Sequence, residues 1–240
     1  SARSSISKSN NDGVLNTTFG TNGFSGFDYP AFFSKISFNN DGKLYTIGAH
    51  SLYRYLNNGN LDLTFGQNGA IDVIAPYNPN NNSIYCDDVL IQSDNKILLI
   101  SDLSLNGNRN LNLLRYTDGG ILDNSFDFDG QVNTIAGLGG NIPYCGFIQS
   151  DQKILIGGQA DTNNSPFRIG MMLVRYNNDG SLDNTFGNNG IQLTQIGDYS
   201  YINSVKILND GKILTTGVSK TTFENFTLVK YNSDGTLDTS

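Results

Sequence analysis

The chain has 240 residues, of which 38% are hydrophobic, 27 are glycine and two are cysteine. Its formal net charge is −7 and its basic residues are scattered, which excludes the clustered positive surface that binds nucleic-acid phosphates or an anionic membrane. No apolar run approaches the length that spans a bilayer, so we expect no membrane insertion, and the even repeat described below favours a single domain over residues 1–240.

Residues 1–23 carry a degenerate form of a motif that returns along the chain. Its clearest copy is YNNDGSLDNTFGNNG at residues 176–190. Residues 6–8 stand where the last copy has residues 228–230, and Asn16 replaces the aspartate of later copies. Weakened motifs are expected of a terminal cap or closing strand. The last copy stops at Ser240, before the TFG that residues 17–23 contain, so the amino-terminal segment could supply the missing last strand and close a ring. Because both ends share the DGxL segment, a piece of a longer array stays open as the alternative.

Two motifs alternate along the chain. The first reads YNNDGSLDNTFGNNG at residues 176–190, and the second reads QSDQKILIGG at residues 149–158. The turn glycine of the first motif recurs at Gly13, Gly59, Gly120, Gly180 and Gly235. The lysine of the second recurs at Lys43, Lys96, Lys153 and Lys212. Two motifs interleaved in one order define a repeating unit of roughly sixty residues.

Each unit is predicted to hold four short antiparallel strands. In the last unit, residues 203–208 and 212–216 flank an Asn-Asp-Gly turn, and residues 226–231 alternate apolar and polar side chains as a half-buried strand does. The fourth strand is the counterpart of residues 190–195. Since no segment of useful length shows helical spacing, the chain is predicted to be all-β, a β-propeller of about four blades with four antiparallel strands each.

The motifs also carry a family resemblance. The pattern QxDxKIL followed by LxRYNxDGSLDxTFGxxG resembles the bacterial delta-60 repeat, a propeller-type repeat of secreted and cell-surface proteins. The resemblance covers almost the whole chain. It implies a propeller in the bacterial envelope or exterior, and it implies no chemistry.

The connections between the predicted strands fall on two faces. The tight Asp-Gly turns lie on one, which we call the turn face, and the links after the second and fourth strands lie on the other, the link face. We expect partner binding at the link face, because binding residues are common on loops of a rigid scaffold, and tyrosines there suit protein contacts or sugar stacking. Neutral drift of loop length and burial of part of these rings in the core are the alternatives. The candidate residues are Tyr29, Tyr77, Tyr144 and Tyr199.

The carboxylates recur in register, which argues against catalysis. A catalytic pair is normally unique, whereas a residue needed once per blade is structural. We predict an ion pair between each corner aspartate and the basic residue before the strand-ending tyrosine. The pairs are Asp62 with Arg54, Asp123 with Arg115, Asp183 with Arg175 and Asp238 with Lys230. His50 is the only histidine, so a histidine metal cluster and most histidine-based triads lack parts.

The run DNSFDFDG at residues 123–130 is the best candidate for a calcium site. Asp127 and Asp129 replace part of the usual Gly-Asn-Asn series, and calcium often takes oxygen ligands from alternate acidic residues before a glycine. Hairpin-turn chemistry explains the same residues and is the preferred interpretation. No other cofactor is expected.

Cys86 and Cys145 lie just upstream of the second motif in successive units. A disulfide between them would suit an oxidising compartment. Their positions differ by two residues when counted from Lys96 and Lys153, so two unpaired thiols are slightly preferred.

These patterns predict a non-catalytic β-propeller that acts as a scaffold or binding module for a protein partner in the periplasm, at the cell surface or outside a bacterium. One version is an accessory subunit that caps or plugs a secretion channel. The alternatives are a carbohydrate-binding module, which stacked exposed tyrosines would favour, and a glycoside hydrolase or lyase, which a partly buried, non-repeated carboxylate pair would favour.

Overall fold

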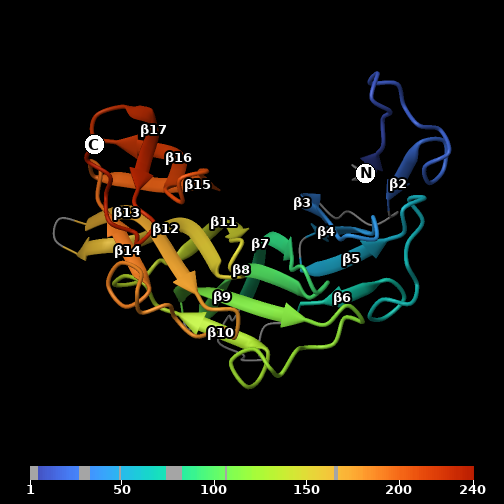
Figure 1. Ribbon diagram of the computed structural model, residues 1–240, viewed down its shortest axis with the longest axis horizontal. Helices are drawn as coiled ribbons and strands as arrows, with labels where there is room; N and C mark the ends of the chain where they lie inside the picture. The colour runs from blue at the N-terminus through green and yellow to red at the C-terminus, as the bar shows by residue number, and fades with distance from the viewer. Residues whose placement is uncertain (1–4, 27–32, 49, 74–82, 106, 165–166) are drawn as a thin grey trace.

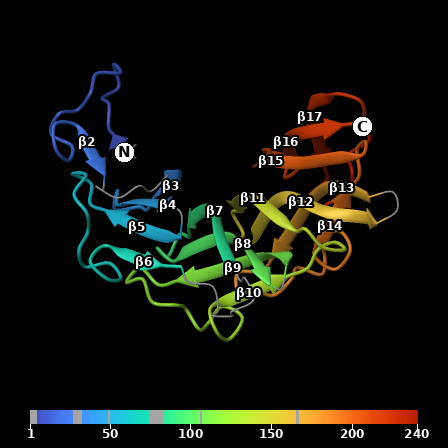
Figure 2. The ribbon, with the colours of Figure 1, turned by 180° about the vertical axis from the view of Figure 1, so that it is seen from behind.

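The computed structural model describes residues 5–26, 33–48, 50–73, 83–105, 107–164 and 167–240. These residues form strands and no helix, and therefore no helix that could cross a membrane. The strands follow one another along an arc, with the amino-terminal pair at one end and the carboxy-terminal strands at the other (Figures 1 and 2). The all-β prediction is thus confirmed for the described residues.

Three blades have the four antiparallel strands predicted for a unit, in chain order. Blade 1 contains β3 (Phe33–Phe38), β4 (Leu44–Gly48), β5 (Ser51–Tyr55) and β6 (Ala70–Asp72). Blade 2 contains β7 (Ser83–Ile91), β8 (Ile97–Leu105), β9 (Asn108–Tyr116) and β10 (Gln131–Thr134). Blade 3 contains β11 (Ile142–Ile148), β12 (Ile154–Asn164), β13 (Phe167–Tyr176) and β14 (Ile191–Thr194).

The strands at the two ends differ from this plan. Blade 4 has three strands among the described residues, and one parallel pair between Ile169 and Tyr199 connects it to blade 3. Its strands are β15 (Tyr199–Ile207), β16 (Ile213–Lys220) and β17 (Glu224–Tyr231). The strands β1 (Ser5–Ser7) and β2 (Phe24–Gly26) pair only with each other.

The sheets of the described residues form no closed ring. Strand β1 corresponds to the third strand of a unit, and β17 does as well, so the chain encodes this position at both ends. Strand β2 hydrogen-bonds to β1, which lies next to it in the sequence, and Ser7 faces Phe24 in the register that Val174 and Ile191 show in blade 3. The sheets form an open arc in place of four identical blades in a closed ring.

The first strand of each blade lines the inside of the arc (Figure 1). Each of these strands contains an irregularity at the same place, nine residues before the lysine of the second motif. In β7 the extra residue is Asp87, and in β11 it is Tyr144. A β-bulge bends the strand and redirects a side chain, so the inner strand of each blade contains one extra residue without a partner in the strand register.

The cores lie between blades. One buried cluster joins Ile47 and Leu52 of blade 1 to Ile97 and Leu99 of blade 2, and similar clusters join blade 2 to blade 3 and blade 3 to blade 4. Burying one such side chain contributes about 1.5–3 kcal/mol, which is why the central strands are apolar on both faces. Each blade is thus stabilised by its neighbours.

The two cysteines are free thiols. Cys86 packs against the core between blades 1 and 2, whereas Cys145 belongs to the core between blades 3 and 4. They lie on opposite sides of the bulge in their strands, which accounts for the offset of two positions. The disulfide considered from the sequence is therefore not formed in this structure.

Candidate functional site

The predicted ion pair is present in all four units. The Nε or Nζ atom of the basic residue lies close to the Oδ2 atom of the corner aspartate. The distances are 2.8 Å for Arg54 and Asp62, 2.8 Å for Arg115 and Asp123, 2.6 Å for Arg175 and Asp183, and 2.7 Å for Lys230 and Asp238. This prediction is confirmed.

A second cation, which the sequence interpretation did not assign, reaches the same carboxylate. Lys153 Nζ lies 2.8 Å from Asp183 Oδ2, and the equivalent lysine of every unit makes the same contact at 2.8–3.8 Å. Burial acts to raise the pKa of Asp183, but hydrogen bonds from Lys153, Thr185 and Arg175 outweigh it and hold the pKa well below its usual range. The signal was available in the sequence, because this lysine recurs as regularly as the aspartate.

The corner also connects each unit to the next. The guanidinium carbon of Arg175 lies 4.4 Å from the ring centroid of Phe186, and its Nη1 donates to the Ser233 carbonyl at 2.6 Å. The ring of Phe186 in turn packs against the turn glycine Gly235, which has a φ of 88°. Arg54 with Phe65 and Arg115 with Phe126 repeat the arrangement. The repeated charges are therefore part of the blade interface.

The calcium candidates take part in turn geometry. Asp127 has a φ of 46°, and its backbone N–H donates to the Asp179 carbonyl at 2.9 Å. Asp129 Oδ1 accepts a hydrogen bond of 2.9 Å from the backbone of Gln131. Within the described part of the chain, no group of three His, Cys, Asp or Glu side chains is arranged to hold a metal. Calcium binding at this corner stays a prediction.

Two of the four predicted tyrosines lie in the described residues, and the structure brings these two together. The hydroxyls of Tyr144 and Tyr199 both donate to Gln159 Oε1, at 3.0 and 3.1 Å. Both rings pack edge to face on Tyr201, with centroids 5.5 and 5.4 Å away. Tyr29 and Tyr77 lie outside the described residues.

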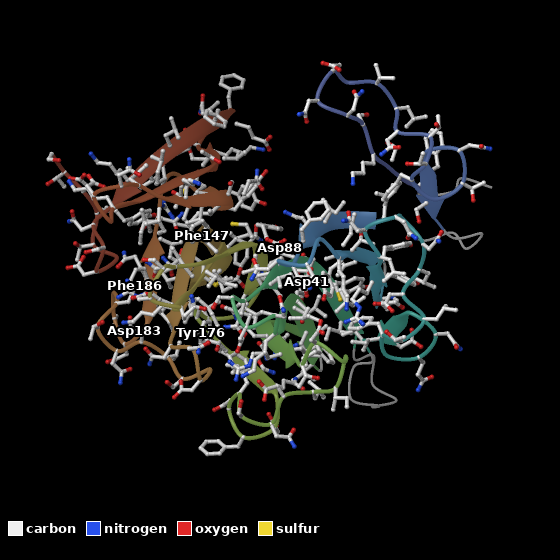
Figure 3. All side chains as sticks on the ribbon, turned by 45° about the vertical axis from the view of Figure 1, so that its right-hand side comes forward. Asp41, Asp88, Phe147, Tyr176, Asp183 and Phe186 are labelled. Atoms are coloured by element: carbon white, nitrogen blue, oxygen red, sulfur yellow. The ribbon has the colours of Figure 1, made fainter. Side chains whose placement is uncertain are left out.

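A charged group adjoins these tyrosines at the link-face end of blade 2. Arg109 Nε donates to Asp102 Oδ2 at 2.6 Å, and the Asp102 side chain is completely buried. The Oδ1 atom of Asp102 and the Oδ2 atom of Asp87 are buried without a hydrogen-bond partner. Asp88 Oδ2 accepts a hydrogen bond of 3.0 Å from the backbone of Gly146 in blade 3. Figure 3 shows Asp88 on the inside of the arc, away from the corner residues Asp183 and Phe186.

The electrostatics of this group centre on Asp87. Burial, followed by the neighbouring charge of Asp102, raises the pKa of Asp87 to about 7, and the charges of Arg109 and Lys35 offset only part of that effect. Burial also raises the pKa of Asp88. Burial and the proximity of Tyr199 raise the pKa of Tyr144 to about 12. A carboxylate with a pKa near neutrality on an inner strand is typical of a functional site.

We call this group the inner cluster. It consists of Asp87, Asp102, Arg109, Tyr144, Gln159, Tyr199 and Tyr201. Four of its members form two pairs that occupy equivalent positions in different blades but differ in identity. Asp87 and Tyr144 are both bulge residues, and Asp102 and Gln159 both follow the motif lysine by six residues, where blade 4 has Val218. The sequence interpretation missed Asp87, Asp102 and Arg109, although polar residues that depart from the repeat at one register are a usable signal.

The comparisons with solved structures show distant likenesses. A protein of unknown function from Bacteroides caccae is 11% identical, with a TM-score of 0.42 over 89% of this chain and 82% of that one. One from Dyadobacter fermentans is 12% identical, with a TM-score of 0.46 over 87% and 67%. Hydrazine synthase from Kuenenia stuttgartiensis is 15% identical, with a TM-score of 0.47 over 95% of this chain and 33% of that one. These values carry no information about function.

The comparison with protein families is more specific. No curated protein matches the chain significantly. A family model described as a domain of unknown function (DUF5122) β-propeller matches residues 40–65, 92–126, 149–186 and 208–240, which together exceed half of the chain. The four matched segments follow the two motifs and the corners that connect successive blades. The chain therefore belongs to the DUF5122 β-propeller family.

Proposed function

We propose that the chain is a non-catalytic β-propeller scaffold that binds a protein partner through its link face. The resemblance of its motifs to the delta-60 repeat supports a place in the bacterial periplasm, at the cell surface or outside the cell. An accessory subunit that caps a secretion channel is one form that such a complex would take.

The observation that carries the proposal is that the residues repeated in every blade and the residues that are not repeated lie in different places. The repeated charged residues are used in the blade interfaces, whereas the non-repeated polar and aromatic residues gather in the inner cluster at the link face. Large apolar side chains are exposed on the surrounding links. These side chains are Ile135, Leu138, Phe167 and Phe223, each more than half exposed. Apolar side chains around a polar, aromatic centre are common in protein interfaces.

The inner cluster fits binding better than hydrolysis. Asp87 and Asp102 are a non-repeated carboxylate pair, which is the feature that would favour an enzyme. However, Asp102 is completely buried and held by Arg109, so only Asp87 is left to reach a substrate, whereas glycoside hydrolysis normally uses two carboxyl groups that flank the scissile bond.

The tyrosines support a protein partner over a carbohydrate. Sugar stacking needs a free aromatic face. Tyr144 and Tyr199 pack against Tyr201, and their hydroxyls are bonded to Gln159. Of the tyrosines in this region, Tyr85 on β7 is about half exposed.

The experiment is a pull-down from envelope extract, followed by purification of the captured protein and measurement of its affinity for two triple variants. In the link-face variant, Ile135, Leu138 and Phe167 are replaced by serine. In the control variant, the exposed turn-face residues Leu63, Ile121 and Phe128 are replaced by serine. We expect the link-face variant to weaken binding by at least about tenfold, since each contact at an interface centre contributes on the order of 1 kcal/mol, and the control to bind normally. Equal affinities for the two variants, or the absence of a stoichiometric partner, would contradict the proposal.

A further inference from the structure

We propose that Asp87 is the anchor of a site for a primary ammonium group, and that a lysine side chain of the protein partner supplies this group. The identity of the source rests on the proposed function, whereas the chemistry of the site rests on the contacts of the inner cluster alone.

The charges around Asp87 do not balance. Three carboxylates, those of Asp87, Asp88 and Asp102, face two cations, Lys35 and Arg109. The other two carboxylates are occupied. Asp102 binds Arg109, and Asp88 accepts hydrogen bonds from the backbone of Val89 and of Gly146. The Oδ2 atom of Asp87 is buried without a hydrogen-bond partner, and no ion pair joins Asp87 to the other described residues. One further positive charge would balance the three carboxylates.

Two carboxylate oxygen atoms of the inner cluster lack a hydrogen-bond donor. Asp102 Oδ1 belongs to a side chain that is completely buried, and Asp87 Oδ2 is buried beside it on the neighbouring strand. Buried polar atoms in folded proteins almost always have a partner, so two such atoms in one cluster indicate a donor that binds there. An ammonium group carries three N–H donors and a positive charge, and therefore satisfies both requirements.

Two tyrosine side chains lie near the carboxylates of Asp87 and Asp102. Tyr85 is the direct cross-strand neighbour of Asp102, stands two residues before Asp87, and has about half of its surface exposed. Tyr144 lies close enough for the charges of Asp87 and Arg109 to act on its hydroxyl. A cation beside tyrosine rings gains a further attraction to their faces. A neutral sugar would leave the charge unbalanced, so the cluster favours an ammonium group.

The pH dependence follows from the groups that face Asp87. These are Asp102 on β8, Arg109 on β9, Asp88 on β7, Lys35 on β3 and Tyr144 on β11. The ammonium group needs Asp87 in its charged form. Because burial and Asp102 raise the pKa of Asp87 to about 7, its charged fraction falls below that pH, and the affinity is expected to drop about tenfold between pH 8 and pH 6.

The test uses three probes and the intact chain. The first is the capped peptide acetyl-Gly-Lys-Gly-amide, the second is the same peptide with its lysine ε-acetylated, and the third is spermidine. Dissociation constants are measured by NMR titration at pH 8. We expect the lysine peptide to bind and the acetylated peptide to bind at least about tenfold more weakly, because acetylation removes the charge and keeps the length. Equal binding of both peptides, or no binding of the lysine peptide and of spermidine, would overturn the proposal.

Two protein variants locate the site. Asp87→Asn keeps the shape of the side chain and removes its charge. It should lower the affinity for the lysine peptide by at least about tenfold and abolish the pH dependence of that affinity. Asp151→Asn changes an exposed turn-face carboxylate and should leave both unchanged. The site would be refuted if Asp151→Asn lowered the affinity as much as Asp87→Asn, or if Asp87→Asn left the affinity unchanged.

The outcome separates this proposal from the proposed function. Asp87-dependent binding of the peptide without a protein partner in extract would support the site and refute the partner. Asp87-dependent binding of spermidine alone would support the ammonium chemistry and identify a free amine as its source. A confirmed partner whose affinity is indifferent to Asp87→Asn would refute the lysine anchor and leave the link-face function standing.

Discussion

At the scale of single residues, the chain uses aspartate in two ways. Asp183 has two cations within 3 Å and a pKa held well below its usual range, because hydrogen bonds outweigh the effect of burial. Asp87 forms no ion pair with the described residues, and burial raises its pKa to about 7. The first arrangement stabilises the folded chain at neutral pH, and the second destabilises it.

Removing Arg175 should be costly. Arg175→Leu leaves Asp183 buried with only Lys153 as its cation and removes the contact with Phe186, so we expect a loss of about 3 kcal/mol in the free energy of unfolding by urea. Lys153→Met removes the more exposed cation and should cost about 1 kcal/mol. Equal costs for the two variants would contradict the central role assigned to the arginine.

The corner aspartates also predict acid lability. Burial acts to raise the pKa of Asp123, but hydrogen bonds from Ser125 and Lys96 outweigh it and lower the pKa to about 2. The stability from this group is fully present above its unfolded-state pKa near 3.8 and is lost as the pH falls toward 2. We expect the melting temperature to decrease between pH 4 and pH 2, and less so in Asp123→Asn.

The pKa of Asp87 is shifted in the opposite direction. Its pKa is higher in the folded chain than in the unfolded chain, so its contribution to stability falls as the pH rises from about 4 to about 7. Asp87→Asn should therefore raise the free energy of unfolding at pH 8 by about 2 kcal/mol and leave it unchanged at pH 4. Destabilisation at pH 8 would mean that the charged form of Asp87 has a partner within the fold.

At the scale of elements, the corner of one unit and the turn of the next form a joint. Gly235 has a φ of 88°, and a Cβ atom there would lie 2.7 Å from the ring of Phe186. Gly13 has a similar φ of 79°, but nothing lies within 4 Å of the position of its Cβ. The two glycines separate the cost of backbone conformation from the cost of the clash.

Gly13→Ala should cost about 1 kcal/mol, because an L residue is strained at positive φ. Gly235→Ala should cost about 2 kcal/mol more, because the ring of Phe186 must also move. Thermal unfolding followed by far-UV circular dichroism measures both changes. Equal costs would show that the corner does not press on the following turn.

The elements were largely predictable from the sequence, and the inner cluster was not. The alternation in residues 226–231, the turn motifs and the recurring Asp–Arg spacing predicted strand β17 and the corner ion pairs, because those interactions lie within one unit. The inner cluster depends on bulges that redirect Asp87 and Tyr144, and on contacts between blades. The bulges recur at one register, but the residue at that register differs between blades, and the contacts between blades follow no period in the sequence.

At the scale of the whole molecule, the repeat predicted the kind of fold and left its closure open. The end motifs allowed a closed ring or a piece of a longer array, and in the structure β1 and β17 both hold the third-strand position, with β2 paired to β1. The result is an arc of blades that pack face to face. The geometry of the corners repeats from blade to blade, whereas the residues at the link face differ between blades. The corners hold neighbouring blades together, and we propose that the link face binds the partner.

The most direct measurement is hydrogen–deuterium exchange of the chain, alone and with its purified partner. We predict added protection at the link face, in residues 83–87, 107–110 and 135–144, and no change in the turns at residues 39–42, 92–95 and 149–152. Protection confined to those turns would place the partner on the opposite face and contradict the account.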